Sequence, residues 1–134
     1  NSREERIVLG NIGRAYNRRG NYSKAIEYQE KSLKIALEIK DPKGESAALS
    51  SLGLVYDNQG NYPKAIDYYL QSLKIDRETK DREGESRTLG NIGLIYDRLG
   101  DDPKAIEYHL QHLKIAQEIK DVQGELNALG NIGV

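Results

Sequence analysis

The sequence repeats itself every forty residues. The stretch at 84–120 reads GESRTLGNIGLIYDRLGDDPKAIEYHLQHLKIAQEIK, and the stretch forty residues earlier reads GESAALSSLGLVYDNQGNYPKAIDYYLQSLKIDRETK. More than half of the residues at 41–80 recur identically at 81–120, and a further shift reaches residues 4–40. Self-similarity at a fixed period is typical of repeat proteins, in which each unit packs on its neighbours. We therefore expect function to reside in the surface that the repeats build, and an enzyme is the least expected class.

Each period divides into two segments with helical spacing of apolar residues, which we call helix A and helix B. In helix A the apolar residues Leu49, Leu52 and Tyr56 recur at intervals of three and four, which indicates one face of a helix. Helix B carries a similar stripe that includes Ala65 and Leu73. The expected ranges are 3–19, 42–58, 82–98 and 122–134 for helix A, and 23–39, 62–79 and 102–119 for helix B.

Residues that start and stop helices recur at the expected boundaries. Asp41, Asp81 and Asp121 precede helix A as N-caps. Pro63 and Pro103 fall in the first turn of helix B, where a missing N–H costs nothing. The connections are only about two residues long, so consecutive helices are expected to be antiparallel neighbours. The residues expected in the left-handed conformation at the end of helix A are Gly20, Gly60 and Gly100.

One glycine per period also lies inside helix A, at Gly13, Gly53 and Gly93. A glycine within a helix costs about 1 kcal/mol relative to alanine, so a compensating interaction is expected. We interpret these glycines as sites of close approach to helix B, with small partners there. The expected partners are Ala25, Ala65 and Ala105.

These positions resemble the tetratricopeptide repeat. The shared pattern is L-x-x-[IL]-G-x-x-Y-x-x-x-G-x-x-x-x-A, which occurs three times in phase. Its second copy consists of Leu49, Leu52, Gly53, Tyr56, Gly60 and Ala65. The period of forty residues is longer than the usual 34 of the family, and the usual proline after helix B is absent. This variant is similar to the repeats of Pins/LGN cell-polarity adaptors, kinesin light chains and bacterial repeat arrays.

The resemblance implies an all-α fold, an α-solenoid of antiparallel helix pairs wound into a right-handed superhelix. The chain is expected to be a single fragment of a longer array, with repeats at about 1–40, 41–80 and 81–120 and a partial repeat at 121–134. The resemblance also implies a protein–protein interaction module. A peptide segment of a partner protein is expected in the concave groove lined by helix A of each repeat.

The expected groove residues occupy the helix A face beside the apolar stripe, because spacings of four, seven and eleven keep one face. Asparagines and a serine recur along it, and amide groups can both donate to and accept from a peptide backbone. Ile7, Ala47 and Val134 lie on the same face. The predicted peptide-binding residues are Asn11, Arg14, Arg18, Ser51, Leu54, Asn58, Arg87, Asn91, Leu94, Arg98, Asn127 and Asn131.

Arginines outnumber aspartates along this face, which favours a partner segment with acidic residues, since arginine binds carboxylates bidentately. The alternative for each arginine is a surface charge with no partner. The clamp that chaperone-tail adaptors of the family use is interrupted at Gly10 and Ser51, so that ligand is not expected. Arg14, Leu54 and Leu94 replace the asparagines of the polarity adaptors, so their ligand is not expected either.

Composition narrows the possible functions. The 134 residues have a net charge of −1, which argues against nucleic-acid binding or membrane binding driven by bulk charge. There is no cysteine, and no apolar run of the roughly 20 residues needed to span a membrane is present. A cytoplasmic location is expected, with no cofactor. The only histidines, His109 and His112, are interpreted as packing or groove-edge residues rather than metal ligands, because no further ligand is arranged around them.

Two other functions remain open. The segment could be a structural spacer or a self-association segment of a larger signalling or scaffold protein. An RNA-binding helical repeat is disfavoured by the neutral charge. The partial repeat at 121–134 has no helix B to cover Leu129 and Ile132, so we expect it to fray or to bury that face against another molecule.

Overall fold

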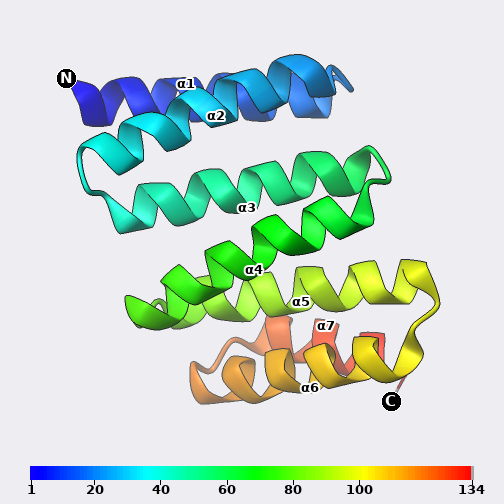
Figure 1. The fold of residues 1–134 in the computed structure, drawn as a ribbon. Coiled ribbons are helices and arrows are strands. Elements are labelled where there is room, and N and C mark those ends of the chain that lie inside the picture. The colour runs from blue at the N-terminus through cyan, green and yellow to red at the C-terminus, as the bar shows by residue number, and fades with distance from the viewer. Residues whose placement is uncertain (134) are drawn as a thin grey trace. The chain divides into compact units, whose positions relative to one another are not determined.

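Seven helices make up the computed structural model, which describes residues 1–133 (Figure 1). The predicted ranges agree with the observed ones to within about two residues. Val134, the last residue of the predicted final helix, lies outside the described residues. The helices are α1 (Ser2–Arg18), α2 (Tyr22–Glu38), α3 (Pro42–Asn58), α4 (Tyr62–Glu78), α5 (Arg82–Leu99), α6 (Asp102–Glu118) and α7 (Val122–Ile132).

Side-chain caps fix where the helices begin. The predicted N-caps are confirmed: the carboxylates of Asp41, Asp81 and Asp121 accept hydrogen bonds from the backbone N–H three residues later. Helix B is capped in the same way, by Asn21 in α2 and Asp101 in α6. Each cap satisfies a backbone donor that the first helical turn leaves without a partner.

Left-handed residues fix where the helices end. Gly20, Gly60 and Gly100 have φ values of 78°, 80° and 76°, as predicted for the end of helix A. The ends of helix B were not predicted to need this conformation. There the left-handed residue is a lysine with φ of 54° to 60°, at Lys40, Lys80 and Lys120.

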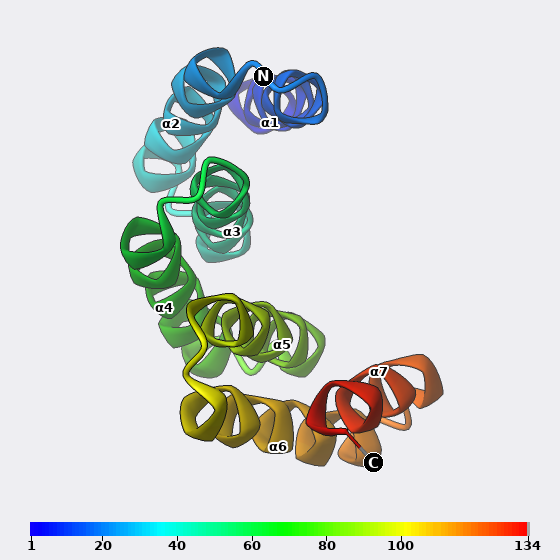
Figure 2. The ribbon, with the colours of Figure 1, turned by 90° about the vertical axis from the view of Figure 1, so that its right-hand side faces the viewer.

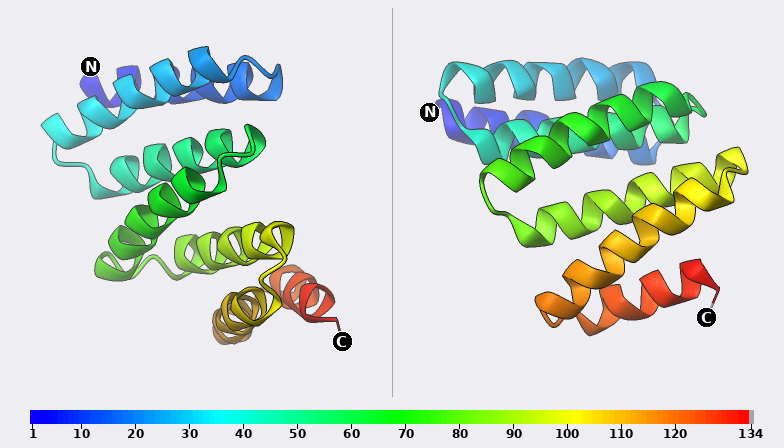
Figure 3. Two further views of the ribbon diagram at one scale, coloured as in Figure 1. Left: turned by 45° about the vertical axis from the view of Figure 1, so that its right-hand side comes forward. Right: turned by 60° about the horizontal axis from the view of Figure 1, so that its bottom comes forward.

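The described chain divides into two compact units, Asn1–Ile75 and Asp76 onward, with the boundary inside α4. In the first unit α2 packs on both α1 and α3, and in the second α6 packs on both α5 and α7 (Figures 2 and 3). The apolar core of the first unit includes Leu49, Leu52 and Tyr69, and that of the second includes Leu89 and Ile92. The predicted stripe of helix A is therefore the buried face.

The glycines inside helix A do mark close approach, but the side chains nearest to them are large ones and not the predicted alanines. A Cβ on Gly53 would lie 2.9 Å from ring carbons of Tyr69, and one on Gly93 would lie 2.6 Å from His109 Cε1. In the first repeat the facing residue is Gln29. Each glycine thus makes room for one large side chain of helix B, because the absence of Cβ matches a bulky neighbour as well as a small one.

Stacked tyrosines join helix A to helix B in every full repeat. The ring centroids of Tyr56 and Tyr68 are 5.5 Å apart, and the rings are nearly parallel, with an interplanar angle of 3°. Lys64 Nζ lies 4.9 Å from the centre of the Tyr56 ring. Such stacking and cation–π contacts add to area burial in stabilising the helix pair. The corresponding pairs are Tyr16–Tyr28 and Tyr96–Tyr108.

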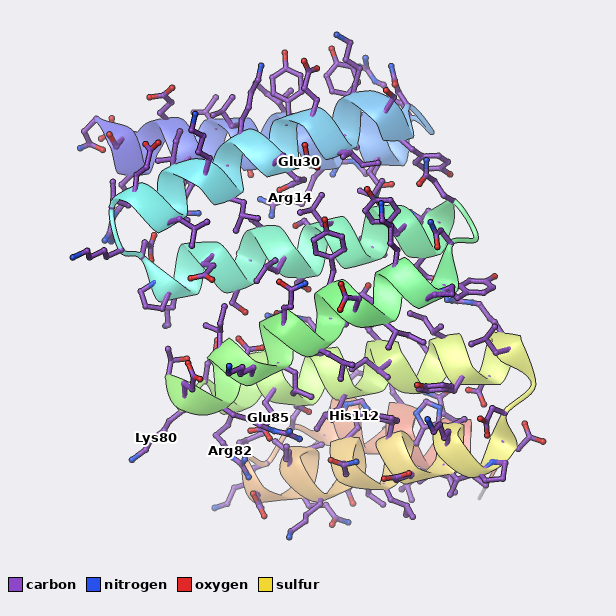
Figure 4. All side chains as sticks on the ribbon, viewed as in Figure 1. Arg14, Glu30, Lys80, Arg82, Glu85 and His112 are labelled. Atoms are coloured by element: carbon purple, nitrogen blue, oxygen red, sulfur yellow. The ribbon has the colours of Figure 1, made fainter. Side chains whose placement is uncertain are left out.

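A chain of ion pairs joins the end of α4 to α5 and α6, and its two central residues, Arg82 and Glu85, are labelled in Figure 4. Glu85 is buried, and its carboxylate accepts from Arg77 Nε at 3.0 Å and from Arg82 Nη1 at 2.7 Å. Arg82 also pairs with Glu118 of α6. A buried carboxylate needs such partners, since it would otherwise raise the free energy of the fold.

Among the described residues, no helix is long and apolar enough to cross a membrane.

Candidate functional site

A cavity of about 970 Å³ lies within the second unit. It is lined by the exposed side of α5, by α7, by the α6–α7 connection and by His112 of α6. Its volume falls at the upper end of the range typical of ligand pockets. The lining is mixed: apolar Leu94, Ile119 and Leu126 alternate with charged and amide side chains.

Five of the twelve predicted site residues line this cavity: Arg87, Asn91, Leu94, Asn127 and Asn131. They come from two helices that both pack on α6. Among residues 1–133, Arg87, Asn91 and Asn131 have no hydrogen-bond or ion-pair partner, whereas Asn127 accepts from Gln123 Nε2 at 2.9 Å. Several polar groups in the cavity are therefore available to a ligand.

A cavity of about 150 Å³ occupies the equivalent place in the first unit, eighty residues earlier. Two predicted residues, Arg14 and Ser51, line it. Here two of the polar side chains are already used: Gln29 Nε2 donates to the Gly10 carbonyl at 2.9 Å, and Ser32 Oγ donates to the Arg6 carbonyl at 3.0 Å. The cavity at the same architectural position is thus much smaller in the first unit than in the second.

The remaining predicted residues line neither cavity. Asn11 accepts from the Arg14 guanidinium, and Asn58 Nδ2 donates to Asn17 Oδ1 at 3.1 Å. Arg18, Leu54 and Arg98 are exposed. Val134, on the same predicted face, lies outside the described residues. A groove that includes all twelve residues stays a prediction.

Two buried polar side chains of the larger cavity have atoms that lack hydrogen-bond partners among residues 1–133. Ser86 is 3% exposed and His112 is 9% exposed, and both line the cavity. Within the described part of the chain, neither Ser86 Oγ nor His112 Nδ1 has a partner. Native proteins leave few buried polar groups unsatisfied, so each one calls for an explanation.

Burial lowers the pKa of the His112 imidazole below its ordinary value, and nearby His109 lowers it further. Asp121 acts in the opposite direction but more weakly. The ring is consequently neutral near pH 7, and its side chain lies between α5 and α6 (Figure 4).

His109 has a different environment. Its side chain is fully buried, and Nε2 lies 2.9 Å from Asp97 Oδ2. Packing against Gly93 agrees with the interpretation of His109 as a packing residue. Among the described residues there is no group of three or more histidine, aspartate or glutamate side chains arranged to hold a metal ion.

Sequence reasoning missed Ser86 as a cavity residue and assigned His112 only to packing or the groove edge. A signal was available in the repeat register. Ser86 and His112 are equivalent to Ser46 and Ser72, whose hydroxyl oxygens are 2.8 Å apart in the second repeat. The replacement of this serine by His112 in the third repeat therefore indicated that the serine–serine contact of the second repeat is changed there.

Comparison with known families identifies the repeats. A model of the tetratricopeptide repeat matches residues 4–78 and, in a second overlapping match, residues 45–118. The chain belongs to the tetratricopeptide repeat family. Tetratricopeptide repeats generally mediate protein–protein interactions. The comparison with curated proteins finds no match.

Solved tetratricopeptide-type structures confirm the predicted fold class, an α-solenoid of antiparallel helix pairs. The TPR domain of Arabidopsis FLU is 27% identical, with a TM-score of 0.81 over 88% of this chain and 99% of that domain. BtubC from P. vanneervenii is 20% identical, with a TM-score of 0.87 over 99% of this chain, which spans 56% of that protein. The STAND protein PH0952 from Pyrococcus horikoshii, which has a tetratricopeptide repeat sensor, is 23% identical, with a TM-score of 0.90. The match covers 98% of this chain and 21% of the PH0952 chain.

Proposed function

We propose that this chain is a non-enzymatic interaction module that binds an extended peptide segment of a partner protein. The segment lies on helix A residues, and the cavity of the second unit is its principal binding site. The observation that carries this proposal is the convergence of Arg87, Asn91 and Asn131 on one cavity without partners in the described chain.

The chemistry of the cavity supports a peptide ligand. Amide side chains such as Asn91 and Asn131 can pair with both the N–H and the C=O of an extended backbone, whatever its sequence. Arg87 can bind a carboxylate with two parallel hydrogen bonds, which favours a segment with acidic residues. Leu94 and Leu126 add apolar surface for the side chains of the segment.

One observation favours a self-association segment as the second candidate function. In α7, Val122 is 68% exposed and Leu126 is 58% exposed, so this helix presents apolar side chains to solvent. Sedimentation at increasing concentration tests this candidate, because self-association would raise the apparent mass.

Selection of peptides from a random display library on the purified chain tests the proposed function. The affinity of the selected peptides is then measured for the double variant Arg87→Ala with Asn91→Ala. Loss of the charge-assisted contact of Arg87 alone costs about 1.5–3 kcal/mol, so we expect affinity to fall about tenfold or more. Circular dichroism should show an unchanged fold, since neither residue belongs to the buried core.

Lys114→Ala is the matched control, because Lys114 is exposed in the same unit but does not line the cavity. We expect it to bind the selected peptides as the unmodified chain does. A library that yields no binding peptide would contradict the proposal. So would a loss of affinity in Lys114→Ala combined with full affinity in the cavity variant.

A further inference from the structure

The third repeat departs from the first two at one pair of polar positions. In the second repeat, Ser46 Oγ and Ser72 Oγ are 2.8 Å apart and satisfy each other. In the first, the serine equivalent to Ser72 donates to a backbone carbonyl. In the third repeat the pair is Ser86 and His112, each more than nine-tenths buried, and neither Ser86 Oγ nor His112 Nδ1 has a partner in the described chain.

The placement of the His112 ring determines which nitrogen a ligand can reach. Nδ1 is buried and lies 2.8 Å from where a Cβ on Gly90 would be, so it faces the backbone of α5. The ring also lines the cavity and keeps 9% of its surface exposed. Nε2 is therefore the nitrogen open to the cavity. A neutral ring with its proton on Nε2 avoids an orphaned buried N–H at Nδ1, so the ring presents a donor to the cavity.

The formal charges of the side chains that line the cavity with His112 sum to zero. From α5 they are Glu83 and Arg87, and from the α6–α7 connection they are Lys120 and Asp121. On its own helix the neighbouring titratable group is His109. The α7 residues that line the cavity are uncharged, and Glu125 of that helix instead accepts from Gln117. An anion that enters would therefore leave an uncompensated negative charge unless a proton entered with it.

We propose that the cavity binds an acidic side chain of the peptide segment, whose carboxylate accepts a hydrogen bond from His112 Nε2, with uptake of one proton from solvent at His112. The inference rests on the proposed function and names the side chain that the cavity selects. The proton adds to Nδ1, and the resulting N–H would donate to Ser86 Oγ once the Ser86 side chain has rotated toward it, since the two atoms are not hydrogen-bonded in the described free chain. The adjacent hydroxyls of Ser46 and Ser72 show that these two positions come within hydrogen-bond distance in this fold.

Proton uptake makes binding depend on pH with a definite sign. Burial lowers the pKa of His112 in the free chain, and a bound carboxylate raises it. Between these two pKa values, affinity increases as pH falls, by at most about tenfold per pH unit. A neutral ligand in the same cavity lacks this dependence.

Two peptide pools provide the probe. Both consist of nonapeptides blocked by acetyl and amide groups, with uncharged flanking residues; one has a central glutamate and the other a central glutamine. The imidazole signals of the chain are followed by NMR from pH 5 to 8. Only two histidines are present, so the spectrum of His112→Ser assigns both.

We expect the glutamate pool to raise the pKa of His112 and to bind at least about fivefold more tightly at pH 5.8 than at pH 7.5. His112→Ser should bind it equally at both pH values. Serine is compatible with the fold at this position, since Ser32 and Ser72 occupy it in the other repeats. Should that variant fail to fold, the pKa of His112 in the unmodified chain with each pool still decides the question.

Two results would overturn the inference, and they are distinguishable. If both pools shift the Asn91 and Asn131 amide signals equally, with no change in the His112 pKa, the cavity binds peptides but does not select an acidic side chain, and only the inference is refuted. If neither pool shifts these signals, both the proposed function and the inference are refuted.

Discussion

The ring of Tyr69 lies directly against the backbone of Gly53, so closely that a Cβ on the glycine would be 2.9 Å from both Cδ1 and Cε1 of the ring. Tyr69 is 1% exposed, so the ring has little room to move away. Gly53 therefore makes room for the ring of Tyr69. The energetic cost of a glycine inside α3 is offset by the burial of that ring.

Replacement of this glycine tests the contact. Gly53→Ala should lower the free energy of unfolding by about 1–3 kcal/mol, because overpacking outweighs the better helix propensity of alanine. Gly10→Ala in the same unit is the control. Its Cβ would meet Ser32 Oγ at an ordinary 3.5 Å, so it should stabilise the chain by up to about 1 kcal/mol. Urea denaturation measures both, and an unchanged midpoint for Gly53→Ala would refute the contact.

The left-handed lysines at the ends of helix B predict a stabilising substitution. Lys40 has φ of 54°, a conformation that costs a residue with Cβ about 1–2 kcal/mol. Lys40→Gly should remove this cost and raise the free energy of unfolding by about 0.5–1 kcal/mol, after allowance for the greater entropy of glycine in the unfolded chain.

Lys34→Gly is the matched control for Lys40→Gly, because Lys34 is an exposed lysine inside α2. There glycine should lower the free energy of unfolding by about 1 kcal/mol. Thermal unfolding followed by circular dichroism compares the two. Equal destabilisation by both variants would mean that the left-handed conformation carries no cost.

Acid should destabilise the chain through His112. Its pKa is lowered in the folded state, mainly by burial, so the unfolded chain binds more protons between that lowered pKa and the ordinary value of 6.5. Stability should therefore fall as pH decreases through about 6.5, and this contribution should level off below the folded pKa. His112→Ser should lose less stability than the unmodified chain between pH 7.5 and pH 5.5. Denaturant titrations at the two pH values measure the difference, and equal losses would contradict it.

Helix α7 should be the least protected helix of the second unit. Within Val122–Ile132 the buried residues are Gly124 and Ala128, and Leu126 is 58% exposed. Few buried contacts imply a low free energy of local opening. Hydrogen exchange at low protein concentration should show faster exchange at 124–132 than at 84–98. Protection that rises with concentration would instead support self-association through this helix.

Local signals in the sequence are enough to predict the helices and their ends. Asp41 before a glycine-containing helix start, Gly60 at a helix end and Pro103 in a first turn each act within four residues along the chain. The spacing of Leu49 and Leu52 likewise indicates the buried face of helix A. These features are readable because capping, turn conformation and helical periodicity depend on neighbours in sequence.

What the sequence by itself determined is thus the all-α architecture, its forty-residue unit and the buried face of helix A. Only the tertiary structure decided which residue faces each helix A glycine: a large side chain, as Tyr69 faces Gly53, rather than the predicted alanine. It also decided that Arg87 and Asn131 share a cavity with Ser86 and His112, whereas Arg18 and Arg98 lie outside it. The physical reason is that these contacts join residues on different helices. Their geometry depends on how the helices rotate and cross, which the periodicity of a single helix does not specify.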